Sequence, residues 1–174
     1  SSNRCAAWLK DVEDRKVLSL RPQCIDEMGF LHPDWQIVVE ADGAKEKWVK
    51  APKSTEPVIP SITKTTIGLV NLHMLGTPLD EAHVHNLKLV TGLLDCSEGA
   101  IMTAPLLAQL VLHKEGLFQY SKGRNIVFCT GYDRVPHGIV DDFVESLADK
   151  DIDMLILADG YKDSCSIRRI VNLK

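Results

Sequence analysis

Two carboxylates, Glu40 and Asp42, follow the apolar run at 37–39 and precede Gly43. Side chains two positions apart in an extended chain point to the same side, so a strand ending here would present both acids together. Open α/β sheets bind ligands at the carboxyl ends of their strands, where carboxylates can hold Mg²⁺ against nucleotide phosphates. We therefore expect Glu40 and Asp42 to be catalytic and Asp42 to be a metal ligand. The alternative is a solvated strand end in which Asp-Gly forms an ordinary turn.

A phosphate-binding loop of the form GxxxxGK[ST] would complete a nucleotide site, but the sequence contains none. The Gly-Lys stretches at 42–45 and 121–124 lack the required spacing. The chain by itself is therefore not expected to hold a triphosphate tightly. Gly43 and Lys50 remain the candidates for contacting a nucleotide, because the segment Lys50–Lys53 could grip an anion. A solvated loop is the alternative for this segment.

The histidines and cysteines offer weaker signals for chemistry. His83 and His85 form an HxH pair with Cys96 a short way on, but structural zinc sites use four ligands, mostly in pairs. Hydrogen-bonded loop histidines are therefore favoured over a metal site. Cys129 ends an apolar run and is expected to be a buried small hydrophobe rather than a catalytic thiol. The five cysteines are scattered without CxxC spacing, which favours reduced thiols in a cytosolic protein.

Apolar runs and helical segments alternate along the chain, which indicates βαβ units and a mostly parallel sheet flanked by helices. We expect strands near 36–40, 66–71, 125–129, 154–158 and 167–173. Helical periodicity runs over residues 6–29, with Pro22 suited to a helix start. Further helices are expected from Asp80 to about Gly92, from Thr103 to about Gly116, and over 138–148.

The composition allows one α/β domain over residues 1–174, since 45% of the 174 residues are hydrophobic. A net charge of −4 and a pI near 5.8 give no electrostatic footprint for nucleic acid. We find no apolar run of about 18 residues and no secretion leader, so we expect a cytoplasmic protein that does not enter a membrane. The chain opens on Ser1 rather than Met, and we expect an N-terminal piece to precede it.

A series of short motifs runs in order over residues 16–133. The motifs are Leu18–Pro22, Val38–Ala44, Val49–Pro52, Glu56–Pro60, Leu75–Asp80, Ile101–Pro105 and Leu112–Leu117. Together they resemble the YqeC family, accessory proteins for selenium-dependent molybdenum hydroxylases. The last forty residues match the family more weakly.

The resemblance implies a nucleotide-binding, P-loop NTPase-like α/β protein whose Gly-Gly-Lys-Thr type phosphate loop would precede residue 1. The chain is then the C-terminal portion of a longer protein, with Mg²⁺ and ATP or GTP as cofactors. Its implied partner is a molybdenum hydroxylase or the molybdenum cofactor. The chain departs from the family twice: Asn71-Leu72-His73 replaces Gly-Leu-Asp, and the stretch 130–133 lacks the Asn and Lys of an Asn-Lys-x-Asp pattern. Asp133 survives in that stretch and is expected to contact the nucleotide.

Three hypotheses follow. The first is a nucleotide-dependent maturation factor with Mg²⁺ near Glu40 and Asp42. The second is a scaffold without hydrolysis, in which the loop from Lys45 to Pro60 grips a client or the phosphate of the pterin. The third is a nucleotidyltransferase acting on the molybdenum cofactor, which would also need paired carboxylates and Mg²⁺.

Overall fold

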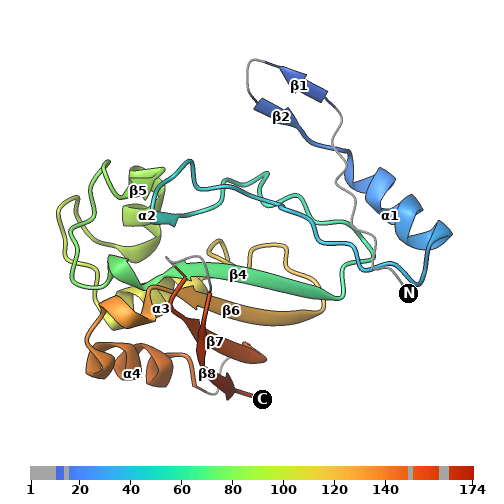
Figure 1. Ribbon diagram of the computed structural model, residues 1–174. Helices are drawn as coiled ribbons and strands as arrows, with labels where there is room; N and C mark the ends of the chain where they lie inside the picture. The colour runs from blue at the N-terminus through green and yellow to red at the C-terminus, as the bar shows by residue number, and fades with distance from the viewer. Residues whose placement is uncertain (1–10, 14–15, 149–150, 161–164) are drawn as a thin grey trace.

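Four strands form the main sheet of the protein, seen in the computed structural model in Figure 1, which describes residues 11–13, 16–148, 151–160 and 165–174. They are β4 (Thr65–Asn71), β6 (Arg124–Thr130), β7 (Met154–Ala158) and β8 (Ile167–Asn172), and they lie side by side in that order. β4, β6 and β7 are parallel, and β8 is antiparallel to β7. The strands expected near 66–71, 125–129, 154–158 and 167–173 are therefore confirmed, in a mixed sheet that is mostly parallel.

Three helices pack together against one face of this sheet: α2 (Leu87–Leu94), α3 (Ala104–Leu112) and α4 (His137–Ser146). Helix α3 begins where the sequence predicted, because the Thr103 hydroxyl accepts a hydrogen bond from the Leu106 amide at 3.4 Å and Pro105 occupies the first turn. The architecture is thus α/β, as expected.

The core lies between the sheet and these helices. Alternate strand residues point into it and are fully buried, among them Val127 and Cys129 of β6 and Leu155 of β7. Leu107 of α3 and Phe143 of α4 fill it from the other side. Cys129 is therefore the buried small hydrophobe that the sequence predicted, and burial raises the pKa of its thiol far above the ordinary value.

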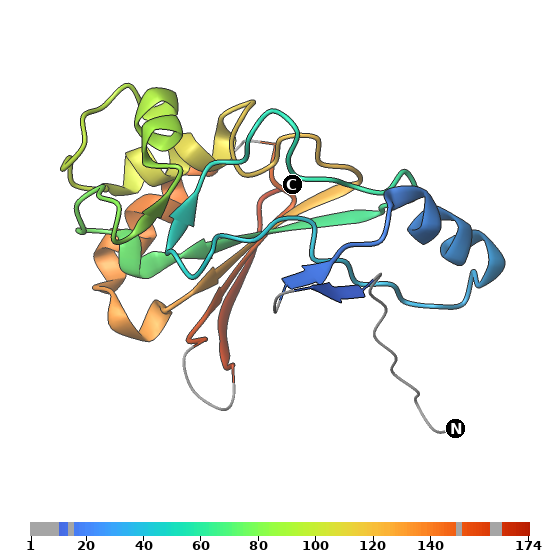
Figure 2. The ribbon, with the colours of Figure 1, turned by 90° about the horizontal axis from the view of Figure 1, so that it is seen from above.

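The helix expected over residues 6–29 is only partly correct. α1 (Pro22–Leu31) starts at the proline, but β1 (Asp11–Glu13) and β2 (Lys16–Leu18) precede it as an antiparallel hairpin. The backbone of Val12 pairs in register with that of Val17, so this part of the apolar pattern reflects strand pairing and not a helix. Residues 6–10 lie outside the described part of the chain. In Figures 1 and 2, α1 lies near the N-terminal end of β4, away from the other helices.

The strand expected at 36–40 is wrong. Residues 35–44 form no helix or strand, and Val38 is 95% exposed. A strand exists only where a neighbour satisfies its backbone N–H and C=O groups. No other strand in the part of the chain that the structure describes pairs with this segment.

The helix expected from Asp80 begins later, at Leu87, because Asp80 caps a turn instead. Its Oδ1 atom accepts hydrogen bonds from the Ala82 amide at 2.9 Å and the His83 amide at 3.0 Å. Two short parallel strands, β3 (Val49–Lys50) and β5 (Val84–His85), flank this turn. Two single turns, η1 (Leu72–Met74) and η2 (Tyr132–Arg134), follow β4 and β6.

A helix must be long and apolar to cross a bilayer. None of the helices in the described residues is long and apolar enough to cross a membrane.

Candidate functional site

The site is built on the short parallel pair β3–β5. Val49 pairs with Val84 and both are buried, which fixes the pair on the core. Lys50 pairs in register with His85 at the edge of that core. The Lys50 side chain is only 10% exposed. A lysine that is this covered requires partners for its ammonium group.

Three groups surround the Lys50 ammonium. It forms an ion pair with the Asp42 carboxylate, and its Nζ atom lies 2.8 Å from Oε2 of Glu56. Nζ also donates to the Gly43 carbonyl oxygen at 3.3 Å. Because Asp42 and Glu56 contact the same nitrogen atom, two carboxylates from either side of Lys50 in the sequence converge on one cation.

The ion pairs keep this cluster charged. Burial acts to lower the pKa of Lys50, but the hydrogen bonds from its ammonium to Asp42 and Glu56 outweigh burial and raise it above the ordinary value. The hydrogen bond from Lys50 is the main cause that lowers the pKa of Glu56, and the Lys53 amide adds to it. Lys50 and Glu56 are therefore both ionised at neutral pH.

Glu40 lies beside the same cluster. Its Oε1 atom is 3.3 Å from the point where a Cβ on Gly43 would stand, so a side chain at position 43 would crowd that carboxylate. The structure thus brings together four residues predicted from sequence: Glu40, Asp42, Gly43 and Lys50. Glu40, Asp42 and Gly43 lie on a loop and Lys50 on the short strand β3. The sequence had predicted instead that the two acids end a central strand.

Asp133 belongs to a different group. It lies in η2, where its Oδ2 atom is 3.9 Å from Nε of Arg134. Its charge also contributes, after that of Asp159, to raising the pKa of Arg168. These residues follow β6 and β7 or lie on β8, and no ion pair or hydrogen bond joins Asp133 to Lys50 among the described residues.

The loop that carries Glu56 is anchored by the segment before β6. The buried Gln119 amide donates to the carbonyl oxygens of Lys53, at 2.8 Å, and Glu56, at 2.5 Å. The Tyr120 hydroxyl donates to the Ser54 carbonyl oxygen at 2.8 Å. Sequence reasoning missed Glu56 as a site residue. Its position in the motif Glu56–Pro60, a few residues after Lys50, was the available signal.

Positive charge gathers around His85. Burial lowers its pKa below the ordinary value, and the charges of Lys45, Lys50 and Lys53 lower it further. His85 is therefore neutral at physiological pH, so one of its ring nitrogens can donate a hydrogen bond and the other can accept one. Lys45 and Lys53 form a cationic rim beside the Asp42–Lys50–Glu56 cluster.

The HxH pair does not form a metal centre in the described part of the chain, where no three His, Cys, Asp or Glu residues converge on one point. His83 is instead the hydrogen-bonded loop histidine that was expected. Its Nδ1 atom lies 2.7 Å from Oδ1 of Asp80, and its ring lies 4.5 Å from that of Trp48.

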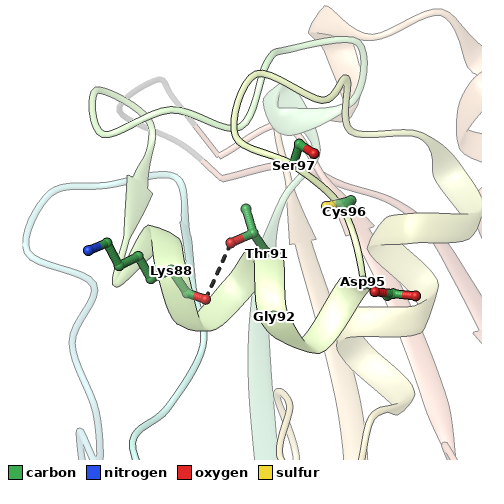
Figure 3. A pocket seen from close by; sticks show the side chains of 6 residues that line it. All are labelled: Lys88, Thr91, Gly92, Asp95, Cys96 and Ser97. Atoms are coloured by element: carbon green, nitrogen blue, oxygen red, sulfur yellow. Dashed lines mark hydrogen bonds between the residues drawn. The ribbon is translucent and has the colours of Figure 1, made fainter.

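A shallow hollow of about 440 Å³ lies beside the end of α2 (Figure 3). It is lined by Lys88, Thr91, Gly92, Asp95, Cys96 and Ser97. Burial and the neighbouring Asp95 raise the pKa of the Cys96 thiol, which disfavours a nucleophilic role. None of the predicted site residues lines this hollow.

The fold and the site define an α/β protein with a mixed sheet and a lysine-centred ion cluster beside it. The chain belongs to the YqeC family, described as YqeC protein, whose pattern matches residues 1–88. It is 26% identical over 161 residues to "Uncharacterized protein YqeC" of Escherichia coli (strain K12). That match covers 90% of this chain and 62% of the relative, so the chain spans less than two thirds of the relative's length. No solved structure matches the chain.

Proposed function

We propose that this chain is part of a cytoplasmic, nucleotide-binding accessory factor for selenium-dependent molybdenum hydroxylases. The observation that carries nucleotide binding is the convergence of Asp42 and Glu56 on Lys50, beside Glu40 and within a rim of lysines. The proposal that the client is a molybdenum hydroxylase rests on the resemblance of the sequence motifs to the YqeC family.

The carboxylates suit a hard cation such as Mg²⁺. Metal-binding carboxylates must be ionised, and Lys50 keeps Glu56 ionised by lowering its pKa. Mg²⁺ takes one or two protein carboxylates and completes its shell with water and phosphate oxygens, so it does not require an all-protein cage. Asp42 and Glu56 would hold the ion, with Glu40 next to them. When bound, Mg²⁺ would neutralise the β- and γ-phosphates.

Lys50 has a defined part in this proposal. Its ammonium stands between the two carboxylates, and a cation bound there would replace it as their partner. The freed ammonium would then pair with a phosphate oxygen, together with Lys45 and Lys53 on the rim. Neutral His85, next to Lys50, adds a hydrogen-bonding group without adding charge.

Calorimetric titration of the full-length protein with ATP and GTP, with and without Mg²⁺, tests the proposal. Asp42→Asn is expected to weaken Mg²⁺-dependent binding about tenfold, which corresponds to about 1.4 kcal/mol. Asp34→Asn is the matched control, because Asp34 is an exposed acid nearby in the chain with no contact to Lys50. Equal affinities of the parent protein and the Asp42 variant would remove the nucleotide proposal.

The anchoring of the loop at 53–56 favours one second candidate, a scaffold that binds an anionic group without hydrolysis. Gln119 and Tyr120 hold three carbonyl oxygens of this loop in place, which presents Lys53 on a fixed backbone. A scaffold would bind phosphate groups equally with and without Mg²⁺, and it would release no inorganic phosphate from ATP or GTP. The same titrations, followed by a phosphate assay, distinguish the two functions.

A further inference from the structure

One face of the main sheet is apolar, and in the described part of the chain its side chains are partly or largely exposed. The paired strands place side chains in rows across this face. The rows are Ile67, Ile126 and Met154, and then Leu69, Phe128, Ile156 and Ile170. We call these seven residues the open face. Leu69 is 69% exposed, Ile67 57% and Ile170 55%, whereas Ile126, Phe128, Met154 and Ile156 on the two inner strands are partly exposed.

The opposite face of the same strands is the buried one. Val70, Val127 and Leu155 alternate with the open-face residues and lie in the core under α2, α3 and α4. On β8, Arg169 points to that side, where its Nη1 atom lies 2.8 Å from Oδ1 of Asp141 in α4. Every helix that connects the parallel strands β4, β6 and β7 therefore lies on one side of the sheet.

A parallel sheet with exposed apolar side chains on one face is physically unusual. Parallel strands are buried on both faces in α/β proteins, and this is why they read as continuous apolar runs rather than alternating ones. The runs here follow that rule, since Ile67, Leu69, Ile126 and Phe128 would be polar if water were their normal environment. A contiguous apolar patch of this kind marks an interface.

The length of the Escherichia coli relative indicates what covers the open face. The match to the Escherichia coli relative leaves more than a third of that relative outside it. We infer that the open face is covered by α-helices from the part of the family protein that lies outside this match. The open face does not include Asp42, Lys50 or Glu56 of the proposed nucleotide site.

Helices are favoured over a second sheet because sheet-on-sheet packing belongs to antiparallel sandwiches, whereas parallel strands are covered by helices. A second copy of the chain is the rival occupant, and it would bring two parallel sheets face to face. The covering helices would carry an apolar stripe that meets Leu69 and Phe128 near the centre of the face.

Hydroxyl-radical footprinting of the full-length protein, read residue by residue by mass spectrometry, tests the inference. Ile139 on the outer side of α4 is the internal reference, because it is the same kind of side chain and is 38% exposed. If helices cover the open face, Ile67 and Ile170 will be labelled severalfold more slowly than Ile139. Faster labelling of Ile67 and Ile170 than of Ile139 at all protein concentrations would overturn the inference.

Substitutions provide the second measurement. Leu69→Glu in the full-length protein is expected to lower Tm by about 4 °C or more, as burial of a charge in an apolar interface requires. Ile139→Glu is the matched control and should leave Tm nearly unchanged. An unchanged Tm for Leu69→Glu would overturn the inference. Protection of Ile67 that disappears on dilution, together with a dimer in light scattering, would assign the face to a second copy and also overturn it.

Discussion

The ammonium nitrogen of Lys50 lies 2.8 Å from the carboxylate of Glu56, and this contact joins β3 to the loop that precedes β4. Asp42, which precedes Lys50 in the sequence, forms an ion pair with the same nitrogen. One lysine therefore ties together three segments whose own backbones share no sheet. The covalent spacing is short, but the geometry depends on Gln119, far along the chain, which fixes the backbone at Glu56.

The Lys50–Glu56 pair should give stability a defined pH dependence. The folded pKa of Glu56 lies below its ordinary value of 4.5, so its contribution is present above pH 4.5 and is lost as pH falls through the folded pKa. The folded pKa of Lys50 lies above 10.5, so its contribution is present below that pH and is lost as pH rises through the folded value. We expect the Tm difference between the parent and Glu56→Gln to be constant from about pH 6 to 9. It should shrink below about pH 4. A difference that grows on acidification would contradict this.

Replacing Lys50 should destabilise the protein more than replacing an exposed lysine. Lys50→Met leaves Asp42 and Glu56 facing each other without their cation, which we expect to cost about 2 kcal/mol. Lys114→Met is the control, because Lys114 is exposed and its ion pair with Glu115 is a surface contact. Urea denaturation measures both. Equal midpoints for the two variants would show that the cluster is not a stabilising contact.

Gln119 is a structural anchor, and its loss should be measurable. Gln119→Leu keeps the size of the side chain but removes the donor to the Lys53 and Glu56 carbonyl oxygens, at an expected cost of about 2 kcal/mol. Gln109→Leu removes a single exposed hydrogen bond to the Leu93 carbonyl oxygen and should cost less than about 0.5 kcal/mol. Chemical denaturation compares the pair, and a larger loss at Gln109 than at Gln119 would be inconsistent with the anchoring.

Substituting two glycines that both have positive φ should distinguish the cost of backbone strain from the cost of a steric clash. Gly123, with φ of 68°, lies where an added Cβ would come 2.0 Å from the Lys64 carbonyl oxygen. Gly76, with φ of 81°, has no atom within 4 Å of that position. Gly76→Ala should cost about 1 kcal/mol from conformation alone. Gly123→Ala should cost about 3 kcal/mol or more, because the start of β6 must shift. Thermal denaturation of both variants decides this, and equal losses would refute the clash.

The thiols should differ in reactivity. Cys165 is exposed and should be alkylated fast in the native state, whereas fully buried Cys129 should react only on unfolding. All five cysteines should react in the unfolded, unreduced protein if they are free, as the sequence predicts. Peptide mapping after alkylation measures each site, and rapid native labelling of Cys129 would contradict its burial.

The sequence by itself determined the elements that depend on local pattern. The apolar runs of β4, β6 and β7 are bounded by turn residues, and such runs predict buried parallel strands without knowledge of their partners. The start of α3 was equally local, because a threonine cap and a proline in the first turn act on their own backbone. Burial of Cys129 followed from its place in one of these runs.

Only the tertiary structure decided what depends on a distant neighbour. The segment 36–40 has the composition of a strand but lacks a paired backbone in the described chain, and composition cannot supply hydrogen bonds. The meeting of Asp42, Lys50 and Glu56 likewise depends on the path of a loop that Gln119 holds from more than sixty residues away. Side-chain types and spacing indicate which charges could pair, but the position of a charge in space is set by long-range contacts that local sequence does not encode.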